Sequence, residues 1–388
     1  MKFDKSTLYH VESSLSGDRH TLYDLATWKN GLAFKKIDFS AIGKPVIKIA
    51  ELNNGIGPNT SFTKGNYGDA VALHWDDLLF SWSGNPQTSI DVFRYRLKDG
   101  WLNQHIFKVT ANEQLISKDF LYYVLKYLKP FFTEIATNKQ TTGLGHITLA
   151  DLKRMSLIVP EGSVQDRIVS ILKSLDDKIE MNTKINKNLE QQASTIYQAW
   201  FEDYIPFDGI CPAEWEKGVL SDIAKIISGK RPPMKSAEKT DIATIPLVGA
   251  SSVMGFTSEA NHTDKILVTG RVGTHGIVQR LNTPCWTSDN TLVITSDLYE
   301  YTYQILQRID YHAINRGSTQ PLITQGDMNK VAILIPDQQT LDDFEVLVGQ
   351  LMLQYEANLL ENAKLAELRD ALLPKLMSGE IDVSDIDL

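Results

Sequence analysis

The sequence predicts an α/β (α+β) protein built from two mixed α/β domains, each followed by a long helix, with the long helices packed on one another. Two observations support this prediction. The stretch Ser163–Asp203 contains neither proline nor glycine and has apolar residues at helical spacing. The same pattern returns 176 residues later, so the chain contains an internal repeat. Because two repeats are too few for a solenoid, we expect a pseudo-twofold pair.

The first long helix is predicted over 161–206. At 1.5 Å per residue, about 40 residues form a rod of roughly 60 Å. Ser163 and Asp166 have the spacing of a capping box at its start. If Ile168 is an a position, the inward positions of successive heptads are Ile168, Ile171, Leu175, Lys178, Asn182, Ile185, Leu189, Gln192, Ile196 and Ala199. This seam is partly polar, and such a helix requires a partner helix to bury it.

The second long helix, predicted over 337–378, is the counterpart of the first. With the 176-residue shift, DLKRMSLIVPEGSVQDRIVSIL (151–172) lies over DMNKVAILIPDQQTLDDFEVLV (327–348) without a gap. The shift also places Asn182 on Asn358. These asparagines either face solvent or form a buried polar layer that fixes the helix register, and the sequence leaves both interpretations open.

The charge distribution explains why an acidic chain is still compatible with nucleic-acid binding. The formal net charge is −9, but residues 337–388 hold 12 Asp and Glu against 3 Lys and Arg, and the rest of the chain has 36 of each. Residues 1–160 carry 19 basic and 15 acidic groups. The acidic excess therefore belongs to the second long helix and to an acidic tail, 379–388, for which we expect a solvated end.

Several classes of protein are disfavoured by what the sequence lacks. No apolar run approaches the about 18 residues of a membrane span, and the first residues lack a signal-peptide core. Cys211 and Cys285 form no metal-binding pattern and the histidines are scattered, so we expect a cytoplasmic protein with reduced thiols and no metal. There is no P-loop, and Gly270–Gly276 does not match a dinucleotide fingerprint. We therefore expect a protein that is not an enzyme.

The globular domains are predicted over 1–160 and 207–336, and their segments repeat in the same order. The apolar run and Gly-rich loop of DDLLFSWSGNPQ (76–87) match DKILVTGRVGTHG (264–276). Further along, the pattern of Trp101, His105 and Val109 matches that of Trp286, Asn290 and Ile294. Each domain ends in a polar loop before the strand that leads to its long helix.

The loops at equivalent places combine lysine and arginine with amide, hydroxyl and imidazole side chains, which contact phosphates and read base edges. Any single one is more often an ordinary solvated loop residue, and the recurrence supports the set. The DNA-binding candidates of the first domain are Lys29, Lys35, Lys36, Trp82, Asn85, Gln104, His105, Asn138, Lys139, Gln140 and Thr141. Those of the second domain are Lys230, Arg231, Lys235, Arg271, His275, Asn290, Arg316, Ser318 and Gln320. Arg271 near His275, and Arg316 with Gln320, best fit guanine or adenine edges.

These features together resemble the specificity subunits of type I restriction–modification systems. The resemblance rests on the duplicated layout, the two helix entries, the loop segments LFSWSG and LVTGRVGTHG, and the C-terminal LRDALLPKLMSGEIDV. The entry to the second helix, Asp337–Thr340, lacks the Glu-Gln pair often found there. No base-reading residue follows from the resemblance, because the recognition domains of such proteins differ widely.

The resemblance implies two target recognition domains, each reading one half of a split, asymmetric sequence in double-stranded DNA. The long helices would pair antiparallel and set the distance between the halves. Two modification (methyltransferase) subunits would dock on the helices and hold S-adenosylmethionine, and restriction subunits would join them. No cofactor is then expected on this chain. The near-neutral charge outside the C-terminal region implies that partner subunits supply part of the phosphate affinity.

A second hypothesis is a coiled-coil scaffold whose globular heads bind protein partners. Sequence-selective, salt-sensitive binding to DNA in the presence of modification subunits would distinguish the two functions.

Overall fold

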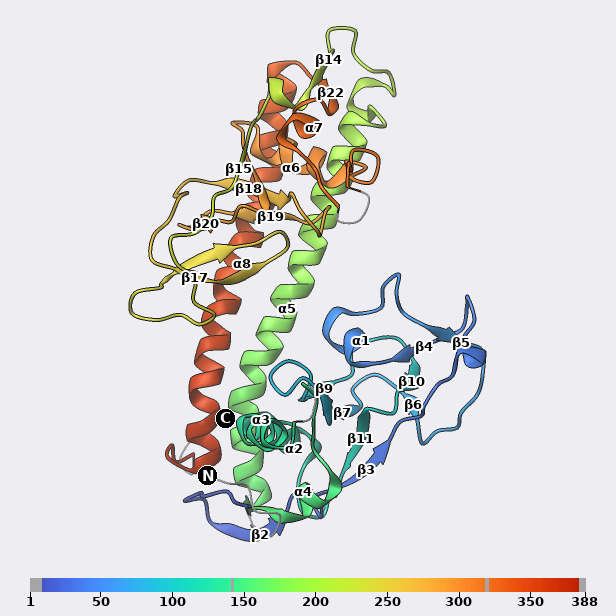
Figure 1. The fold of residues 1–388 in the computed structure, drawn as a ribbon, viewed down its shortest axis with the longest axis vertical. Helices are drawn as coiled ribbons and strands as arrows, with labels where there is room; N and C mark the ends of the chain where they lie inside the picture. Colours follow the sequence, from blue (N-terminus) through green and yellow to red (C-terminus); the bar gives the residue numbers. More distant parts are fainter. Residues whose placement is uncertain (1–8, 141–142, 318–320, 384–388) are drawn as a thin grey trace. The chain divides into compact units, whose positions relative to one another are not determined.

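The computed structural model describes residues 9–140, 143–317 and 321–383 of the chain. The chain forms two compact units, one of Met1–Glu180 with Asn362–Leu388 and one of Met181–Glu361. Each unit combines a globular α/β part with portions of both long helices (Figure 1). Within the described ranges, no helix is long and apolar enough to cross a membrane.

The long helices are α5 (Gly162–Phe201) and α8 (Gln338–Ser378). Because α5 already begins at Gly162, Ser163 lies inside the helix, and the capping box expected at Ser163 is wrong. The backbone N–H groups of the first turn donate to the Glu161 carbonyl instead. At the start of α8, the Asp337 carboxylate accepts the Thr340 N–H at 3.0 Å and its hydroxyl at 2.6 Å, so this helix has a side-chain cap.

The buried stripe of α5 differs from the predicted heptad seam. Lys178, Ile185 and Gln192 are exposed, whereas Asn186 and Ala193 are buried. An α-helix has 3.6 residues per turn, so a straight helix drifts by about 20° per heptad from a strict 3.5-residue repeat. The inward face therefore moves along the helix, and the strict heptad positions fail in its middle and second half.

Helices α5 and α8 run antiparallel. In the second unit, Asn182 bonds to Glu361 at 2.7 Å, and Asn186, one turn further along α5, bonds to Asn358, which lies earlier in α8. The expected antiparallel arrangement is confirmed by this pairing.

The first unit contains three sheets and a short ribbon. The sheets have the strand orders β1-β13-β2, β5-β4-β10-β6 and β3-β11-β7-β9, and the ribbon pairs β12 with β8. The strands are β1 (Tyr9–His10), β2 (Gly17–Thr21), β3 (Ala26–Asn30), β4 (Lys44–Ile47), β5 (Phe62–Thr63), β6 (Ala72–Leu73), β7 (Leu78–Ser81), β8 (Ser83–Gly84), β9 (Asp91–Arg94), β10 (Gly100–Leu102), β11 (Ile106–Ala111), β12 (Gly145–His146) and β13 (Met155–Pro160). The helices are η1 (Lys36–Asp38), α1 (Ile49–Asn54), α2 (Lys118–Tyr127), α3 (Lys129–Asn138) and α4 (Leu149–Arg154).

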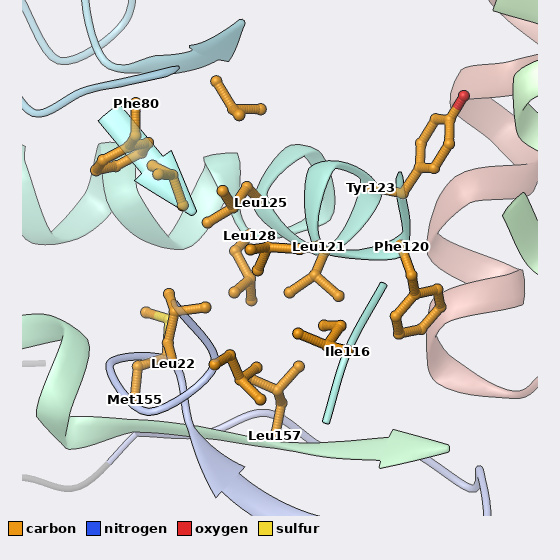
Figure 2. Packing of buried hydrophobic residues seen from close by; sticks show 14 of the residues in the cluster. Leu22, Phe80, Ile116, Phe120, Leu121, Tyr123, Leu125, Leu128, Met155 and Leu157 are labelled. Carbon is orange, nitrogen blue, oxygen red and sulfur yellow. The ribbon is translucent and has the colours of Figure 1, made fainter. Parts of the chain in front are cut away.

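The core of the first unit forms around α2, whose apolar residues recur at helical spacing. The side chains of Leu121 and Leu125 in α2, and of Leu128 at its C-terminal end, pack in one cluster with Leu22 and Met155, which lie on the side of the strands (Figure 2). All five side chains are essentially inaccessible to solvent, so this cluster fixes α2 against the sheets.

The second unit contains sheets with the strand orders β14-β22, β15-β21-β18-β19 and β17-β16-β20. Its strands are β14 (Glu216–Val219), β15 (Lys225–Ser228), β16 (Ile245–Val248), β17 (Val253–Thr257), β18 (Ile266–Gly270), β19 (Val278–Leu281), β20 (Trp286–Thr287), β21 (Thr291–Thr295) and β22 (Ala332–Ile335). Its shorter helices are η2 (Ile205–Phe207), η3 (Leu220–Asp222), α6 (Tyr299–Arg308) and α7 (Gln325–Asn329).

The two units repeat the same local topology. The orders β3-β11-β7-β9 and β15-β21-β18-β19 correspond strand for strand, and all these pairs are antiparallel. In the adjoining sheets, Trp101 pairs in parallel with Val46, and Trp286 pairs in parallel with Leu247. The match of Trp101 with Trp286 expected from the sequence is therefore confirmed.

Candidate nucleic-acid interface

In each unit, the end of a central strand crosses the polar loop that precedes the long helix. We call this feature the crossover ribbon. It comprises residues 82–84 with 145–147 in the first unit, and residues 271–273 with 321–323 in the second. Both halves of each ribbon belong to loops in which the sequence predicts DNA-binding residues.

The first crossover ribbon is held by backbone pairing. Ser83 and Gly84 pair antiparallel with His146 and Gly145. The Ile147 N–H donates to the Trp82 carbonyl at 2.8 Å. Residues more than sixty positions apart are thereby fixed side by side.

The second crossover ribbon has the same bonds. Val272 forms an antiparallel bridge with Leu322, and the Gly273 N–H donates to the Pro321 carbonyl at 3.0 Å. The Ile323 N–H donates to the Arg271 carbonyl at 2.9 Å. Arg271 therefore occupies in this unit the position that Trp82 occupies in the first.

A third segment joins each ribbon at that same residue. The Trp82 N–H donates to the His105 carbonyl at 3.2 Å, and the Arg271 N–H donates to the Asn290 carbonyl at 2.8 Å. The expected match of His105 with Asn290 is confirmed by this bond. Three candidate-bearing segments thus meet at one residue in each unit.

A glycine with positive φ follows two residues after the crossing residue in both ribbons. Gly84 has φ 134° and Gly273 has φ 84°, a region that other residues rarely adopt. A Cβ at Gly84 would also lie 2.5 Å from Cβ of Ser89. The chain therefore turns away from the ribbon at the same place in both units.

Trp82 is surrounded by aromatic and imidazole rings. Its ring stacks on Phe107 with centroids 5.7 Å apart, and the rings of His105 and His146 lie at 5.7 and 6.0 Å. Its indole N–H donates to the side chain of Asn30 at 3.0 Å. Trp82 is half-buried, so part of the ring reaches solvent from a fixed position.

The second unit presents different chemistry at this place. Arg271 is half-buried, and among the described residues its Nε is buried without a hydrogen-bond partner. His275 contacts the Gly270 carbonyl through Nδ1 at 3.2 Å, and its Nε2 is likewise buried without a partner in the described part of the chain. Polar nitrogen atoms are therefore held in the loop after β18.

Two candidate cations form ion pairs at the base of their loops. Lys139 pairs with Asp151, and Arg316 pairs with Asp327. The two aspartates are equivalent in the repeat, and each is the third residue of a short helix, α4 or α7, where its carboxylate accepts the N–H of the N-cap threonine. Burial alone would raise the pKa of Asp151, but Lys139 and the Thr148 cap outweigh it and hold the pKa below its usual range.

These ion pairs change the interpretation of Lys139 and Arg316. Lys139 is largely covered and neutralises a buried carboxylate, so it is engaged inside the loop. The Arg316 side chain is 64% exposed despite its ion pair and still faces solvent.

The remaining candidates lie mostly on loop and strand surfaces. Exposed positions are Lys29, Lys35, Lys36, Asn85, His105, Asn138, Gln140, Lys230, Arg231, Lys235 and Asn290, and Gln104 is half-buried. The Asn85 side chain accepts the Gln87 and Thr88 N–H groups at 3.0 and 3.2 Å, so it forms the turn itself. Thr141, Ser318 and Gln320 lie outside the described residues.

Sequence reasoning missed two polar groups at the first ribbon. Asn30 bonds Trp82, and His146 bonds the Ser83 hydroxyl at 2.9 Å. Both lie close in sequence to predicted residues, Asn30 next to Lys29 and His146 in the loop that contains Asn138 and Gln140, but neither was among the predicted residues.

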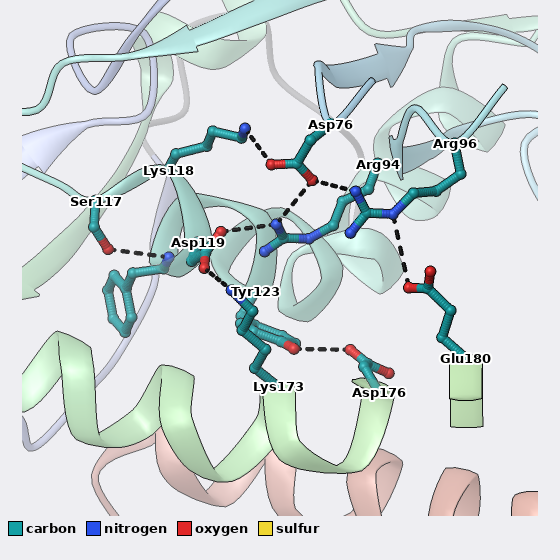
Figure 3. A network of polar contacts seen from close by, with 11 residues as sticks. Asp76, Arg94, Arg96, Ser117, Lys118, Asp119, Tyr123, Lys173, Asp176 and Glu180 are labelled. Carbon is teal, nitrogen blue, oxygen red and sulfur yellow. Dashed lines mark hydrogen bonds and ion pairs between the residues drawn. The ribbon is translucent and has the colours of Figure 1, made fainter. Parts of the chain in front are cut away.

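A second polar network fastens the sheet of the first unit to α5 and α2 (Figure 3). Arg94 of β9 pairs with Asp119 of α2 at 2.7 Å and lies over the Tyr122 ring at 4.6 Å. Arg96 reaches Glu180 of α5 at 3.7 Å. Burial opposes the charge of Asp119, but Lys173 and Arg94 outweigh it and lower the pKa of this carboxyl.

The second unit has a matching network. Arg280 of β19 forms two bonds to Glu300 of α6, at 2.5 and 2.7 Å, and one to Glu356 of α8 at 3.1 Å. It also lies 4.8 Å from the Tyr303 ring centre. The sheet that carries each crossover ribbon is therefore tied to a long helix within its own unit. We call these networks the sheet–helix clamps.

The helix-register candidates form a buried polar layer in the second unit. Asn182 and Asn358 are 1% and 4% exposed, and Asn186, which the sequence reasoning missed, is 5% exposed. Asn358 donates to Asn186 at 2.8 Å, and Asn186 donates to the Tyr355 carbonyl at 3.1 Å. Their placement matches the buried interpretation left open by the sequence, and their effect on register stays a prediction.

Comparison with known proteins gives a consistent match. The family model for the type I restriction modification DNA specificity domain matches residues 19–191 and 212–369. The chain is 23% identical over 386 residues to the type I restriction enzyme HindI specificity subunit of Haemophilus influenzae, covering 74% of this chain and 84% of that protein. It is 28% identical over 324 residues to the MjaIX specificity subunit of Methanocaldococcus jannaschii, covering 73% of each.

A solved structure has the same fold. The crystal structure of the S subunit of a type I restriction–modification system from M. genitalium aligns with a TM-score of 0.57 at 16% identity, covering 96% of this chain and 98% of that one.

Proposed function

The chain belongs to the type I restriction modification DNA specificity family, and we propose that its two units each read one half of a split, asymmetric DNA sequence. As a specificity subunit it is the non-catalytic DNA-recognition component of a type I restriction–modification system. The observation that most supports reading by halves is the pair of crossover ribbons. They share backbone bonds and differ in side chains, as expected for two domains of the same fold that recognise different DNA sequences.

The proposed division of the chain follows the repeat. Target recognition domains cover 1–160 and 207–336, helical spacers cover 161–206 and 337–378, and 379–388 is an acidic tail. The helices set the number of unread base pairs between the two half-sites. The antiparallel pairing of α5 and α8 supports this role, because it gives each unit a segment of both helices.

The partners are DNA and other components of the restriction–modification complex. We propose in more detail that two modification subunits dock on the long helices and carry S-adenosylmethionine, and that restriction subunits join this assembly. A cytoplasmic location belongs to the same proposal, and it is supported by the free thiols of Cys211 and Cys285.

The DNA contacts are proposed in two groups. The exposed cations around β3 and after β15, such as Lys29 and Arg231, would contact phosphates and give affinity for any sequence. The crossover ribbons would contact base edges and give selectivity. Lys139 is assigned to loop structure, because its charge is used by Asp151.

A domain exchange tests the proposal. The full chain is expressed with its modification partner in cells, and the methylated sequences are mapped. Replacing 1–160 by the equivalent domain of another family member should change one half of the methylated motif and leave the other half and the gap unchanged. The reciprocal exchange of 207–336 is the matched control and should change only the other half. A change of both halves by either exchange would contradict independent reading.

A further inference from the structure

We propose that Trp82 and Arg271 are equivalent specificity-determining residues, with Trp82 selecting a thymine in one half-site and Arg271 selecting a guanine in the other. This inference rests on the proposed function, since it needs each unit to read its own half. It goes further by assigning the same position in both units and the chemical group that each reads.

The equivalence is carried by backbone bonds alone. In each unit the crossing residue donates its N–H to the residue that precedes a central strand, and its carbonyl accepts from an isoleucine before a capped helix. In the first unit, Trp82 donates to His105 and accepts from Ile147. In the second unit, Arg271 donates to Asn290 and accepts from Ile323. The bonding pattern is the same in both units, although the spacing between the three segments along the chain differs.

The direction of the Cα–Cβ bond is fixed at this position. Both backbone groups of the residue are used, and the residue lies directly after a central strand of the four-stranded sheet. The glycine two residues later turns the chain away. A side chain placed here projects from a rigid element, which is where a selective contact is best supported.

Arg271 has the chemistry to read guanine. A guanidinium matches the O6 and N7 acceptors of guanine with two parallel hydrogen bonds, the commonest specific arginine contact in the major groove. No carboxylate is paired with Arg271 in the described part of the chain, in contrast to Arg316 with Asp327, Arg280 with Glu300 and Arg308 with Glu202. The charge of Arg271 is therefore available to a ligand.

Trp82 has the chemistry to read thymine. Its indole N–H is already donated to Asn30, so the group that remains is the apolar ring. The stack on Phe107 holds this ring in place. An apolar surface fixed at the base edges distinguishes the C5-methyl group of thymine from the other bases.

Modified bases test the assignment on the unaltered protein. The full chain is purified with its modification subunits, the motif is established, and binding is measured on duplexes that carry one analogue at a time. Uracil in place of the selected thymine lacks only the methyl group, and 7-deazaguanine has a C–H group in place of the N7 acceptor. Each should weaken binding of the wild-type complex, and the loss of the full contact should be roughly 5- to 150-fold.

Variants complete the cycle. Arg271→Ala should bind duplexes with guanine and with 7-deazaguanine equally well, and its methylated motif should lose selectivity at one position of one half-site. Trp82→Phe, which keeps a packed ring, should reduce the penalty for uracil in the other half-site. Arg231→Ala is the matched control, because it removes an exposed cation of the same unit and should weaken all duplexes equally.

The outcomes separate the inference from its premise. Uniform weakening by Arg271→Ala, equal to that of Arg231→Ala, would overturn the assignment of Arg271. An unchanged uracil penalty in Trp82→Phe, or no penalty in the wild type at any thymine of that half-site, would overturn the assignment of Trp82. If the wild-type complex bound all duplexes equally, the proposed function itself would be refuted.

Discussion

The sheet–helix clamp of the second unit offers a sharp test of what holds a recognition sheet in place. The Arg280 and Glu300 side chains are 5% and 3% exposed, and two short hydrogen bonds join them. Glu300→Gln keeps the shape but removes the charge, which leaves Glu356 as the remaining ion-pair partner of a buried guanidinium among the described residues. Removing one member of a buried ion pair costs about 3–5 kcal/mol. Because Glu356 retains part of the pairing, we expect the lower end, about 3 kcal/mol.

The assays are urea unfolding and thermal unfolding of the full chain, with hydrogen exchange of the β19 and α6 amides to localise the effect. A loss of about 3 kcal/mol in a unit of this size lowers Tm by roughly 6–12 °C. Glu202→Gln is the matched control, because its pair with Arg308 is 46% exposed at the carboxylate and should be worth less than about 1 kcal/mol. If Glu300→Gln cost no more than Glu202→Gln, the clamp would not be a stabilising element.

Three further predictions follow from the same structure. The pKa of Asp119 is lowered in the folded state, so its stabilisation is present above the usual pKa of about 4 and is lost as pH falls below it; Asp119→Asn should reduce the difference in urea midpoint between pH 7 and pH 3. Asn358→Leu removes the donor to the buried side-chain oxygen of Asn186 and should cost about 1–3 kcal/mol in chemical unfolding, whereas leucine at both positions should restore most of the loss. Inserting four residues after Leu189 lengthens the helix by roughly 6 Å and should lengthen the methylated motif's gap by one or two base pairs with both halves kept, so an active variant with the original gap would refute the spacer role.

The long-range repeat could be predicted from the sequence because it depends only on spacing along the chain. The 176-residue shift matched the two helices, and the burial of Asn182 and Asn358 agrees with the inward positions it assigned. The seam positions Lys178, Ile185 and Gln192 were wrong, because a strict heptad assumes 3.5 residues per turn along the whole helix, whereas a straight α-helix has 3.6.

The arrangement of the site could not be predicted, because it depends on contacts between distant segments. His146 reaches Ser83 across 63 positions and Trp82 reaches Asn30 across 52. Lys139 shows the same limit in another way. Its charge suggests a phosphate contact, but its partner is a buried helix-capping carboxylate whose burial no local pattern reveals.

The two units have the same fold, so comparing them separates the residues that support the sheet from those proposed to read DNA. The clamp keeps its chemistry at equivalent positions, with Arg94 and Arg280 opposite Leu78 and Leu267 and each paired with an acidic residue of the next helix. The crossover ribbon keeps its backbone and changes its side chains.

A domain transplanted into this chain should therefore retain the clamp arginine and its acidic partner while its ribbon is free to vary. Loss of the arginine in the transplant would weaken the attachment of the sheet to the long helix. Selectivity at that half-site would then fall, although the ribbon residues are unchanged. A ribbon changed with the clamp intact would move the selectivity to new bases without affecting stability. Stability and selectivity are therefore expected to depend on different residues of the same sheet.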